Sequence, residues 1–405
     1  MRLADASAGF EPRFPRLGAM RLPAAALPIL AAILSITCAA DASDVAVIWT
    51  DRPEIAFHAM QFNASHPRHG VEVFFRADPA QDMRAGGDLP DIVIAGFLPS
   101  AGTRDLFAPL DHLLEGDDGI EDAFYPRLMA TGRVGGAQMF LPVSFSAPMA
   151  VFPRGHPGLS NPLTIGTEEM RELGGAFNAR NAGGFTRMGF SPTWNDDFLF
   201  TAATLHGASF AEAAPLTWNA SALTAAVGFM GEWLTDTNTG TAATANFTYR
   251  FFTLPPPAMV TSGRILFAYM DAADFLTIPE SRRTALDFRW LANGDEIPML
   301  DGAVFLGMTG RGDAPRAAAE FARWFFRAET QREMLERSHA FGQMEVSFGI
   351  VGGFSALRPV TEQVFPHLYP ELLGRIPPAD FLSPPPVLPA DWPAMKERVV
   401  LPYLR

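Results

Sequence analysis

Blocks of apolar residues along the chain predict strands that alternate with helices. Consecutive apolar and β-branched residues predict strands at residues 44–50, 71–76 and 91–95, the last of them buried on both faces of a sheet. Residues 53–66 carry apolar side chains at near-helical spacing, and residues 106–114 show a similar pattern. Strands that alternate with helices in this way indicate an α/β sheet with right-handed crossovers.

The apolar pattern continues beyond this first unit. Residues 139–152 form an apolar segment, interrupted by Ser144 and Ser146, that is too long for one ordinary strand. We therefore expect this segment to leave one sheet and enter another. Further along, residues 221–234 predict a helix and residues 264–270 predict a strand.

An uncharged apolar segment near the start has the layout of an export signal. Residues 22–37 follow Arg21 and are followed by small residues. The segment is too short and too interrupted by proline for a membrane-spanning helix, which needs about 20 predominantly apolar residues. Met20 and Arg21 repeat the opening of the chain, and residues 1–19 place acidic residues ahead of the apolar segment. We therefore expect translation to begin at Met20, within a signal region of residues 1–37.

Cys38, the only cysteine of the chain, stands directly after this segment. A lone cysteine cannot form an intramolecular disulfide. Residues 34–38 (LSITC) are similar to a bacterial lipobox, whose cysteine is lipidated and becomes the mature N-terminus. The similarity implies a membrane tether through Cys38. Cleavage by the ordinary signal peptidase, for example after Ala42, and a retained anchor are the alternatives.

The charge balance disfavours several classes of partner. The chain has 31 basic and 44 acidic residues, a net charge of −13, which becomes −15 without residues 1–37. Nucleic-acid binding depends on neutralising phosphates with lysine and arginine, so we expect no nucleic acid partner. An anionic membrane surface is disfavoured for the same reason. Lys396 is the only lysine, which excludes a Walker-type phosphate site.

Several motifs occur in a fixed order across nearly the whole chain after the signal. They are residues 89–96 (LPDIVIAG), 107–111 (FAPLD), 141–145 (LPVSF), 263–270 (GRILFAYM) and 318–333. In this order they resemble the extracellular solute-binding proteins of ABC importers, the large family that includes maltose-binding protein. The resemblance implies an α/β, two-lobed periplasmic-binding-protein fold of type II. Each lobe would be a mixed sheet flanked by helices, with a hinged cleft between the lobes.

The resemblance also implies how the chain is divided. We expect an N-terminal lobe built from residues 44–145 and 271–327, and a C-terminal lobe built from residues 147–268 and 329–405. Hinges are expected near residues 144–147, 268–271 and 327–329, because hinges are a few residues at the ends of elements.

Ligand contacts are expected directly after strand ends. Trp49 and Asp51 follow the first strand, and such a pair suits a sugar, because the ring stacks on the apolar sugar face while the carboxylate accepts hydroxyl hydrogens. Phe97 follows the third strand, and like Trp49 it can instead be a packing residue. Ser144 and Ser146, at the first expected hinge, can bind ligand or satisfy local backbone groups.

The loop after the strand near residue 190 offers the densest cluster of candidates. Trp194 is a possible stacking platform, and Asn195 and Asp197 are polar groups beside it. Asp196 or Asp197 is also an obvious helix N-cap, so we expect one of them to be structural.

Tyr269 and Asp271, beside the second expected hinge, complete the set of candidates. The sequence has no H-E-x-x-H, G-x-S-x-G, C-x-x-C or G-x-G-x-x-G motif, so we expect no catalytic residue, metal or cofactor. The interpretation is an exported, non-enzymatic, monomeric solute-binding component of an ABC importer, for a sugar or oligosaccharide, that works with membrane permease subunits. The alternatives are a secreted carbohydrate-active enzyme that uses cleft carboxylates, such as Asp196 or Asp197 with Asp271, and a ligand-presenting sensor of the same fold.

Overall fold

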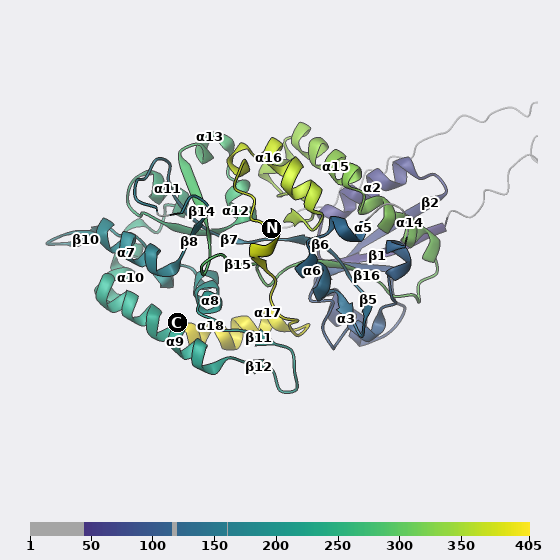
Figure 1. Cartoon of the computed structure of the whole chain (residues 1–405), viewed down its shortest axis with the longest axis horizontal. Helices are drawn as coiled ribbons and strands as arrows, with labels where there is room; N and C mark the ends of the chain where they lie inside the picture. The colour runs from purple at the N-terminus through teal and green to yellow at the C-terminus, as the bar shows by residue number, and fades with distance from the viewer. Residues whose placement is uncertain (1–43, 116–119, 160) are drawn as a thin grey trace, which may run out of the picture. The chain divides into compact units, whose positions relative to one another are not determined.

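Two larger β-sheets organise the chain, and helices pack against both (Figure 1). The computed structural model describes residues 44–115, 120–159 and 161–405, and Asp44–Arg405 form one compact unit. Cys38 and the expected export signal lie outside the described residues. Within the described part of the chain, no helix is long and apolar enough to cross a membrane.

The first sheet has six strands in the order β17-β6-β16-β3-β1-β2. Its strands are β1 (Asp44–Thr50), β2 (His69–Phe75), β3 (Ile92–Gly96), β6 (Leu141–Phe145), β16 (Val304–Met308) and β17 (Phe354–Ser355). β1 pairs in parallel with both β2 and β3, and the helices α2 (Glu54–Ser65) and α3 (Pro79–Ala85) form the crossovers. This confirms the α/β pattern predicted for the first hundred residues of the unit. β16 runs antiparallel to β3 and β6.

Asp91 explains part of the sequence pattern directly before β3. The residue is 5% exposed, and its carboxylate accepts hydrogen bonds from the amide of Val47 in β1 and the amide of Ala314, both at 2.8 Å. Ala314 directly precedes α14 (Pro315–Phe325). A buried carboxylate is tolerated where donors satisfy it. Asp91 therefore ties α14 to the middle of the first sheet.

The second sheet has four strands in the order β13-β7-β14-β8. They are β7 (Pro148–Pro153), β8 (Thr164–Ile165), β13 (Ala268–Asp271) and β14 (Leu286–Leu291), and β7 runs antiparallel to both of its neighbours. The helices of this part of the chain are α7 (Thr167–Phe177), α8 (Asp196–Leu205), α9 (Ala220–Glu232), α10 (Thr241–Phe251), α11 (Pro256–Thr261), α12 (Ala272–Leu276) and α13 (Glu280–Arg283).

The chain passes directly from the first sheet to the second. Only Ser146 and Ala147 separate β6 from β7, which confirms that the long apolar segment leaves one sheet and enters another. The carbonyl of Ser146 accepts from the amide of Leu300 at 2.9 Å, and the carbonyl of Ala147 accepts from the amide of Ala272 at 3.1 Å. Two further chain segments are thereby attached to the crossing.

Sheet membership differs from the expected lobe boundaries at two places. β14 lies within residues 271–327, expected in the N-terminal lobe, but it pairs with β7 and β8 of the second sheet. β17 lies within residues 329–405, expected in the C-terminal lobe, but it pairs with β6 of the first sheet. Alternating apolar and polar residues predict a strand, but they do not predict which sheet the strand joins. That choice depends on tertiary packing.

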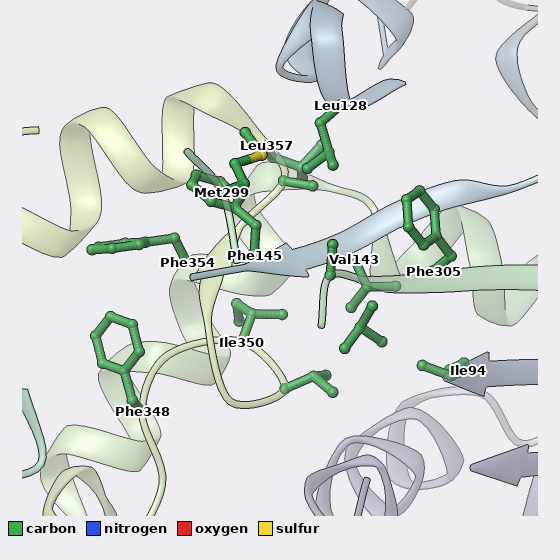
Figure 2. Packing of buried hydrophobic residues seen from close by; sticks show 14 of the residues in the cluster. Ile94, Leu128, Val143, Phe145, Met299, Phe305, Phe348, Ile350, Phe354 and Leu357 are labelled. Carbon is green, nitrogen blue, oxygen red and sulfur yellow. The ribbon is translucent and has the colours of Figure 1, made fainter. Parts of the chain in front are cut away.

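Aromatic side chains fill the core around β6 (Figure 2). Phe145 points from β6 toward Phe354, with ring centroids 5.8 Å apart, and Phe354 meets Phe348 edge-on at 5.0 Å. A second buried cluster surrounds Phe198 and Trp233 near α8 and α9. Truncating such a buried phenylalanine to alanine typically costs about 3–5 kcal/mol, so these clusters hold both sheets in place.

The C-terminal segment runs from the first sheet's helices to those of the second. After α15 (Ala328–Ala340), β17 and α16 (Phe365–Leu368), the short strand β18 (Leu382–Ser383) pairs with β15 (Ile297–Pro298). The last helices, α17 (Trp392–Met395) and α18 (Leu401–Leu404), are yellow in Figure 1, and α18 packs against α8. The remaining short elements are α4 (Asp111–Leu114), α5 (Ile120–Ala123), α6 (Pro126–Thr131), β4 (Arg133–Val134), β5 (Ala137–Gln138), β9 (Ala179–Asn181), β10 (Gly184–Arg187), β11 (Phe210–Ala211) and β12 (Thr217–Trp218).

Candidate ligand-binding cavity

A cavity of about 300 Å³ lies beside the crossing from β6 to β7. This central cavity is lined by residues from β6, α8, β13, the turn before β16 and the C-terminal segment. It brings together six of the ten candidates chosen from the sequence: Ser144, Ser146, Asn195, Asp197, Tyr269 and Asp271. The fold therefore collects residues from the first sheet and from the second into one polar site.

The two serines at the crossing have different roles. The hydroxyl of Ser144 donates to the carbonyl of Val351 at 3.1 Å. Val351 and Gly352 line the cavity with φ angles of +51° and +74°, and a positive φ is strained for a β-branched residue. The Oγ of Ser146 is buried and finds no hydrogen-bond partner among the described residues. That hydroxyl is therefore available to a ligand.

Asn195, rather than either aspartate, caps helix α8. Its side-chain oxygen accepts from the amide of Phe198 at 3.0 Å, so the expectation that Asp196 or Asp197 is the N-cap is wrong. The physical reason is position: Asn195 has extended backbone angles, while α8 already begins at Asp196. Asp196 instead pairs with Arg405 at the C-terminus.

Tyr269 and Asp271 bring two buried polar groups from β13. The Tyr269 hydroxyl lies 3.0 Å from the hydroxyl of Thr201, and burial raises the pKa of this tyrosine. Asp271 accepts from the amide of Asp274 at 2.6 Å and so caps α12. Burial raises the pKa of Asp271 to about 6; the nearby charges of Asp274 and Asp197 add to this effect, and the hydrogen bond from the Asp274 amide opposes it.

The sequence candidates did not include the four other charged residues that line the cavity in the described part of the chain: Arg52, Asp274, Asp301 and Lys396. Asp301 accepts from the indole Nε1 of Trp392 at 2.7 Å, and Lys396 lies 3.1 Å from the same carboxylate oxygen. The Asp-Gly pair at residues 301–302, directly before a buried strand, was a turn signal that could have suggested Asp301. Lys396 could have been noticed as the only lysine of the chain.

The other four candidates lie elsewhere. Asp51 and Phe97 line a second cavity of about 810 Å³, which is also lined by residues of the C-terminal segment such as Pro393 and Arg398. Burial raises the pKa of Asp51, and the adjacent Arg52 partly counteracts this. Phe97 has a φ of +59°, a strained angle at the end of β3.

Neither tryptophan candidate lines the central cavity. The guanidinium of Arg76 lies 4.8 Å from the ring centroid of Trp49. Trp194 stacks on Phe247 with centroids 5.8 Å apart and an interplanar angle of 19°, and it meets Phe190 edge-on at 5.7 Å. Phe200, six residues after Trp194, does line the cavity, as do Phe145 and Tyr269.

The polar groups that line the central cavity are mostly oxygen atoms that can accept hydrogen bonds, with a few hydrogen-bond donors. In the part of the chain that the structure describes, no group of three or more histidine, cysteine or carboxylate residues could hold a metal ion. Carboxylates, hydroxyls and one half-buried aromatic ring suit a polyhydroxylated ligand, since carboxylates accept hydroxyl hydrogens and rings stack on apolar sugar faces.

Comparisons with known proteins identify the fold. No model of a known protein family matches the sequence, and no curated protein matches it. The sugar-binding protein MalE from Xanthomonas citri matches with a TM-score of 0.62 and 14% identity, over 89% of this chain and 91% of its own. An ABC substrate-binding protein from Listeria monocytogenes, in complex with cycloalternan, matches with a TM-score of 0.60 and 15% identity, over 89% and 92%. The chain has the fold of ABC solute-binding proteins.

Another structure with this solute-binding fold supports the same assignment. The GacH receptor of Streptomyces glaucescens, solved without ligand and with acarbose, has a TM-score of 0.59 and 15% identity over 89% of this chain and 92% of its own. These matches confirm the predicted two-lobed α/β fold. All three matched proteins are binding proteins or receptors by their descriptions.

Proposed function

We propose that this protein is the substrate-binding component of an ABC importer and that it captures a sugar or oligosaccharide in the central cavity. The observation that carries the proposal is the convergence of Ser146, Asp197 and Asp271, from three separate chain segments, on one polar cavity at the crossing between the sheets. The names of the matched proteins, which refer to sugars or oligosaccharides, support the choice of ligand class.

Recognition would rest on hydrogen bonds from one buried hydroxyl and one exposed carboxylate. The free hydroxyl of Ser146 can donate to or accept from a sugar hydroxyl, and the carboxylate of Asp197 retains an oxygen that can accept one. Phe200 offers an apolar face beside them. A solute that left the buried Ser146 hydroxyl unpaired would be disfavoured, which is how such sites discriminate between ligands.

Capture would involve closure of one lobe on the other about the short connections between the sheets. Ser146 and Ala147 form one such connection, and β13 leads into α12 beside them. Hinge motions of this kind are confined to a few residues at element ends. The closed form would then be delivered to permease subunits in the membrane.

Export and tethering belong to the same proposal. The apolar segment at residues 22–37 would direct the chain out of the cytoplasm, and lipidation of Cys38 would keep a monomeric binder near its permease. The negative net charge supports the expectation that nucleic acid is not a partner.

A ligand screen tests the proposal. The protein expressed from Asp44 should melt higher in maltotriose or mannotriose, because a ligand that binds only the folded state stabilises it by mass action. Amino acids and polyamines are the comparison ligands. Chromatography of each incubated sugar tests for turnover, and released product would favour the carbohydrate-active enzyme. No shift with any sugar would contradict the choice of ligand.

A variant locates the site. Replacing Ser146 by alanine should weaken binding of the sugar identified in the screen about tenfold, as expected for one buried hydrogen bond. Ser281→Ala, at an exposed position in α13, is the matched control and should bind as the wild type does. Equal affinity of both variants would place the ligand outside the central cavity.

A further inference from the structure

The only lysine of the chain lies inside the central cavity. Lys396 follows α17 in the C-terminal segment, and its side chain is 14% exposed. Arginine supplies every other basic side chain, thirty in all. The position of this one ammonium group is therefore a specific feature of the site and not part of a general lysine surface.

The ammonium of Lys396 is held on three sides. Its Nζ lies 3.2 Å from Oδ1 of Asp197, 3.1 Å from Oδ2 of Asp301, and 4.3 Å from the ring centroid of Phe200. A lysine ammonium has three N–H donors, and two carboxylates and one ring face can occupy them all. These are also the partners that the amino group of a cationic ligand would choose.

The remaining charges of the cavity are mostly negative. Asp271 and Asp274 also line it, and Arg52 is the only other basic residue among the described residues of its lining. The guanidinium of Arg52 lies 3.2 Å from a carboxylate oxygen of Asp51, which is not part of this lining. Without Lys396, four carboxylates would face one guanidinium that already has a partner of its own. Lys396 therefore controls how strongly the cavity attracts a cation.

We propose that Lys396 makes the central cavity select uncharged sugars over amino sugars, an inference that rests on the proposed sugar-binding function. The tethered ammonium occupies the place between Asp197 and Asp301 where the amino group of a ligand would bind. The carboxylate lone pairs that it leaves free accept hydroxyl hydrogens from an uncharged ring. An amino sugar would have to displace the lysine or place its charge beside it.

Substitution of Lys396 tests this selectivity. The uncharged probes are cellotriose, maltotriose and mannotriose, and the cationic probe is chitotriose, which differs from cellotriose by amino groups in place of the 2-hydroxyls. In Lys396→Met, which keeps an unbranched side chain one atom shorter and removes its charge, the affinity for chitotriose relative to the best uncharged probe should rise at least about tenfold. Lys396→Arg keeps the charge and should preserve the wild-type ratio.

The outcomes separate the inference from the proposed function. If the wild type binds an uncharged probe and folded Lys396→Met shows the wild-type ratio, the inference is overturned and the proposed function stands. If the wild type binds none of the sugars, the proposed function fails and the inference fails with it. Circular dichroism of each variant establishes that it is folded.

A measurement on the unmodified side chain covers the case in which Lys396→Met does not fold. Because the chain has one lysine, growth on [13Cε]lysine gives a single side-chain cross-peak in a carbon–proton correlation spectrum. A bound uncharged probe at saturation should shift this peak, since the ammonium group lines the cavity. A peak that stays unchanged at saturation would show that Lys396 does not face the ligand and would overturn the inference.

Discussion

A carboxylate oxygen of Glu212 accepts a hydrogen bond from the backbone amide of Ala101 at 2.6 Å, across 111 positions of sequence. Ala101 follows β3 of the first sheet, and Glu212 follows β11, between helices α8 and α9 that pack beside the second. The bond joins a loop beside the first sheet directly to a loop beside the second. Opening of the lobes about the β6–β7 crossing would break it.

We expect Glu212→Ala to favour the open form and to weaken ligand binding. A hydrogen bond to a charged but exposed group is worth about 1 kcal/mol, which corresponds to roughly fivefold in the dissociation constant. Isothermal titration with the sugar identified by thermal shift measures the change. Glu212→Gln keeps a side-chain oxygen acceptor and should retain most of the affinity. Identical affinities in both variants and the wild type would mean that this bond does not contribute to closure.

Asp271→Asn should stabilise the unliganded protein at pH 7. Burial raises the pKa of Asp271 from 3.8 to about 6. Ionisation of this carboxyl therefore lowers the free energy of unfolding as the pH rises from about 4, and the loss is complete above about 6. Asparagine keeps the acceptor that caps α12 and removes this cost. The gain in the free energy of unfolding should be about 1–3 kcal/mol at pH 7.

Urea unfolding of the wild type and Asp271→Asn at pH 4 and pH 7 measures that gain. The two proteins should differ at pH 7 and agree at pH 4, where both side chains are uncharged. A difference of equal size at both pH values would point to packing, not ionisation, as its cause.

His58 should limit stability in mild acid. Its ring is fully enclosed beside Phe325, neither ring nitrogen has a hydrogen-bond partner among the described residues, and burial lowers its pKa from 6.5 to about 4. The His58 imidazole therefore becomes protonated below about pH 6.5 in the unfolded chain, but only below about pH 4 in the native state. Stability is lost across this window, by about 3 kcal/mol in total.

Replacing His58 by leucine removes the titrating group. Thermal unfolding should then become less sensitive to pH between 6.5 and 4 than in the wild type. His339→Leu, at an exposed position in α15, is the control and should leave the pH dependence unchanged. If His58→Leu loses stability between pH 6.5 and 4 as steeply as the wild type, another titrating group causes that loss.

Gly189 should tolerate no side chain. A Cβ there would lie 2.1 Å from the Cα of Gly174 in α7, a clash between two backbones that no rotamer change relieves. We expect Gly189→Ala to lower the free energy of unfolding by more than about 2 kcal/mol. Gly228→Ala is the matched control: this glycine lies inside α9 with open space around it, so alanine should add about 1 kcal/mol. Urea midpoints of both variants give the comparison, and equal effects would mean that α7 can shift.

Local sequence patterns predicted where strands and helices lie better than they predicted which strands pair with one another. The length of the apolar segment at residues 139–152 was enough to predict the change of sheet, because an ordinary strand cannot use so many residues. The sheets that β14 and β17 join could not be predicted, since packing between distant segments decides which sheet a strand enters.

The site was predictable where it depends on strand ends and not where it depends on the C-terminal segment. Ser146 and Asp271 lie at strand ends and were found. Trp194 and Phe200 are both aromatic and lie six residues apart. Trp194 packs on Phe247 while Phe200 lines the cavity, a difference that the sequence pattern does not show. Lys396 follows a proline-rich stretch without periodicity, so no pattern placed it beside Asp301.

The six-stranded sheet has a consequence for biosynthesis. It joins β1, which begins at Asp44, to β17, which ends at Ser355, so a growing polypeptide cannot complete the sheet until nearly all of it has left the ribosome. Sheets that pair such distant segments form slowly, because long loops must close before their contacts stabilise them. A chain that folds late remains extended while it is being made, and that is the state in which a polypeptide can still be threaded through a translocation pore.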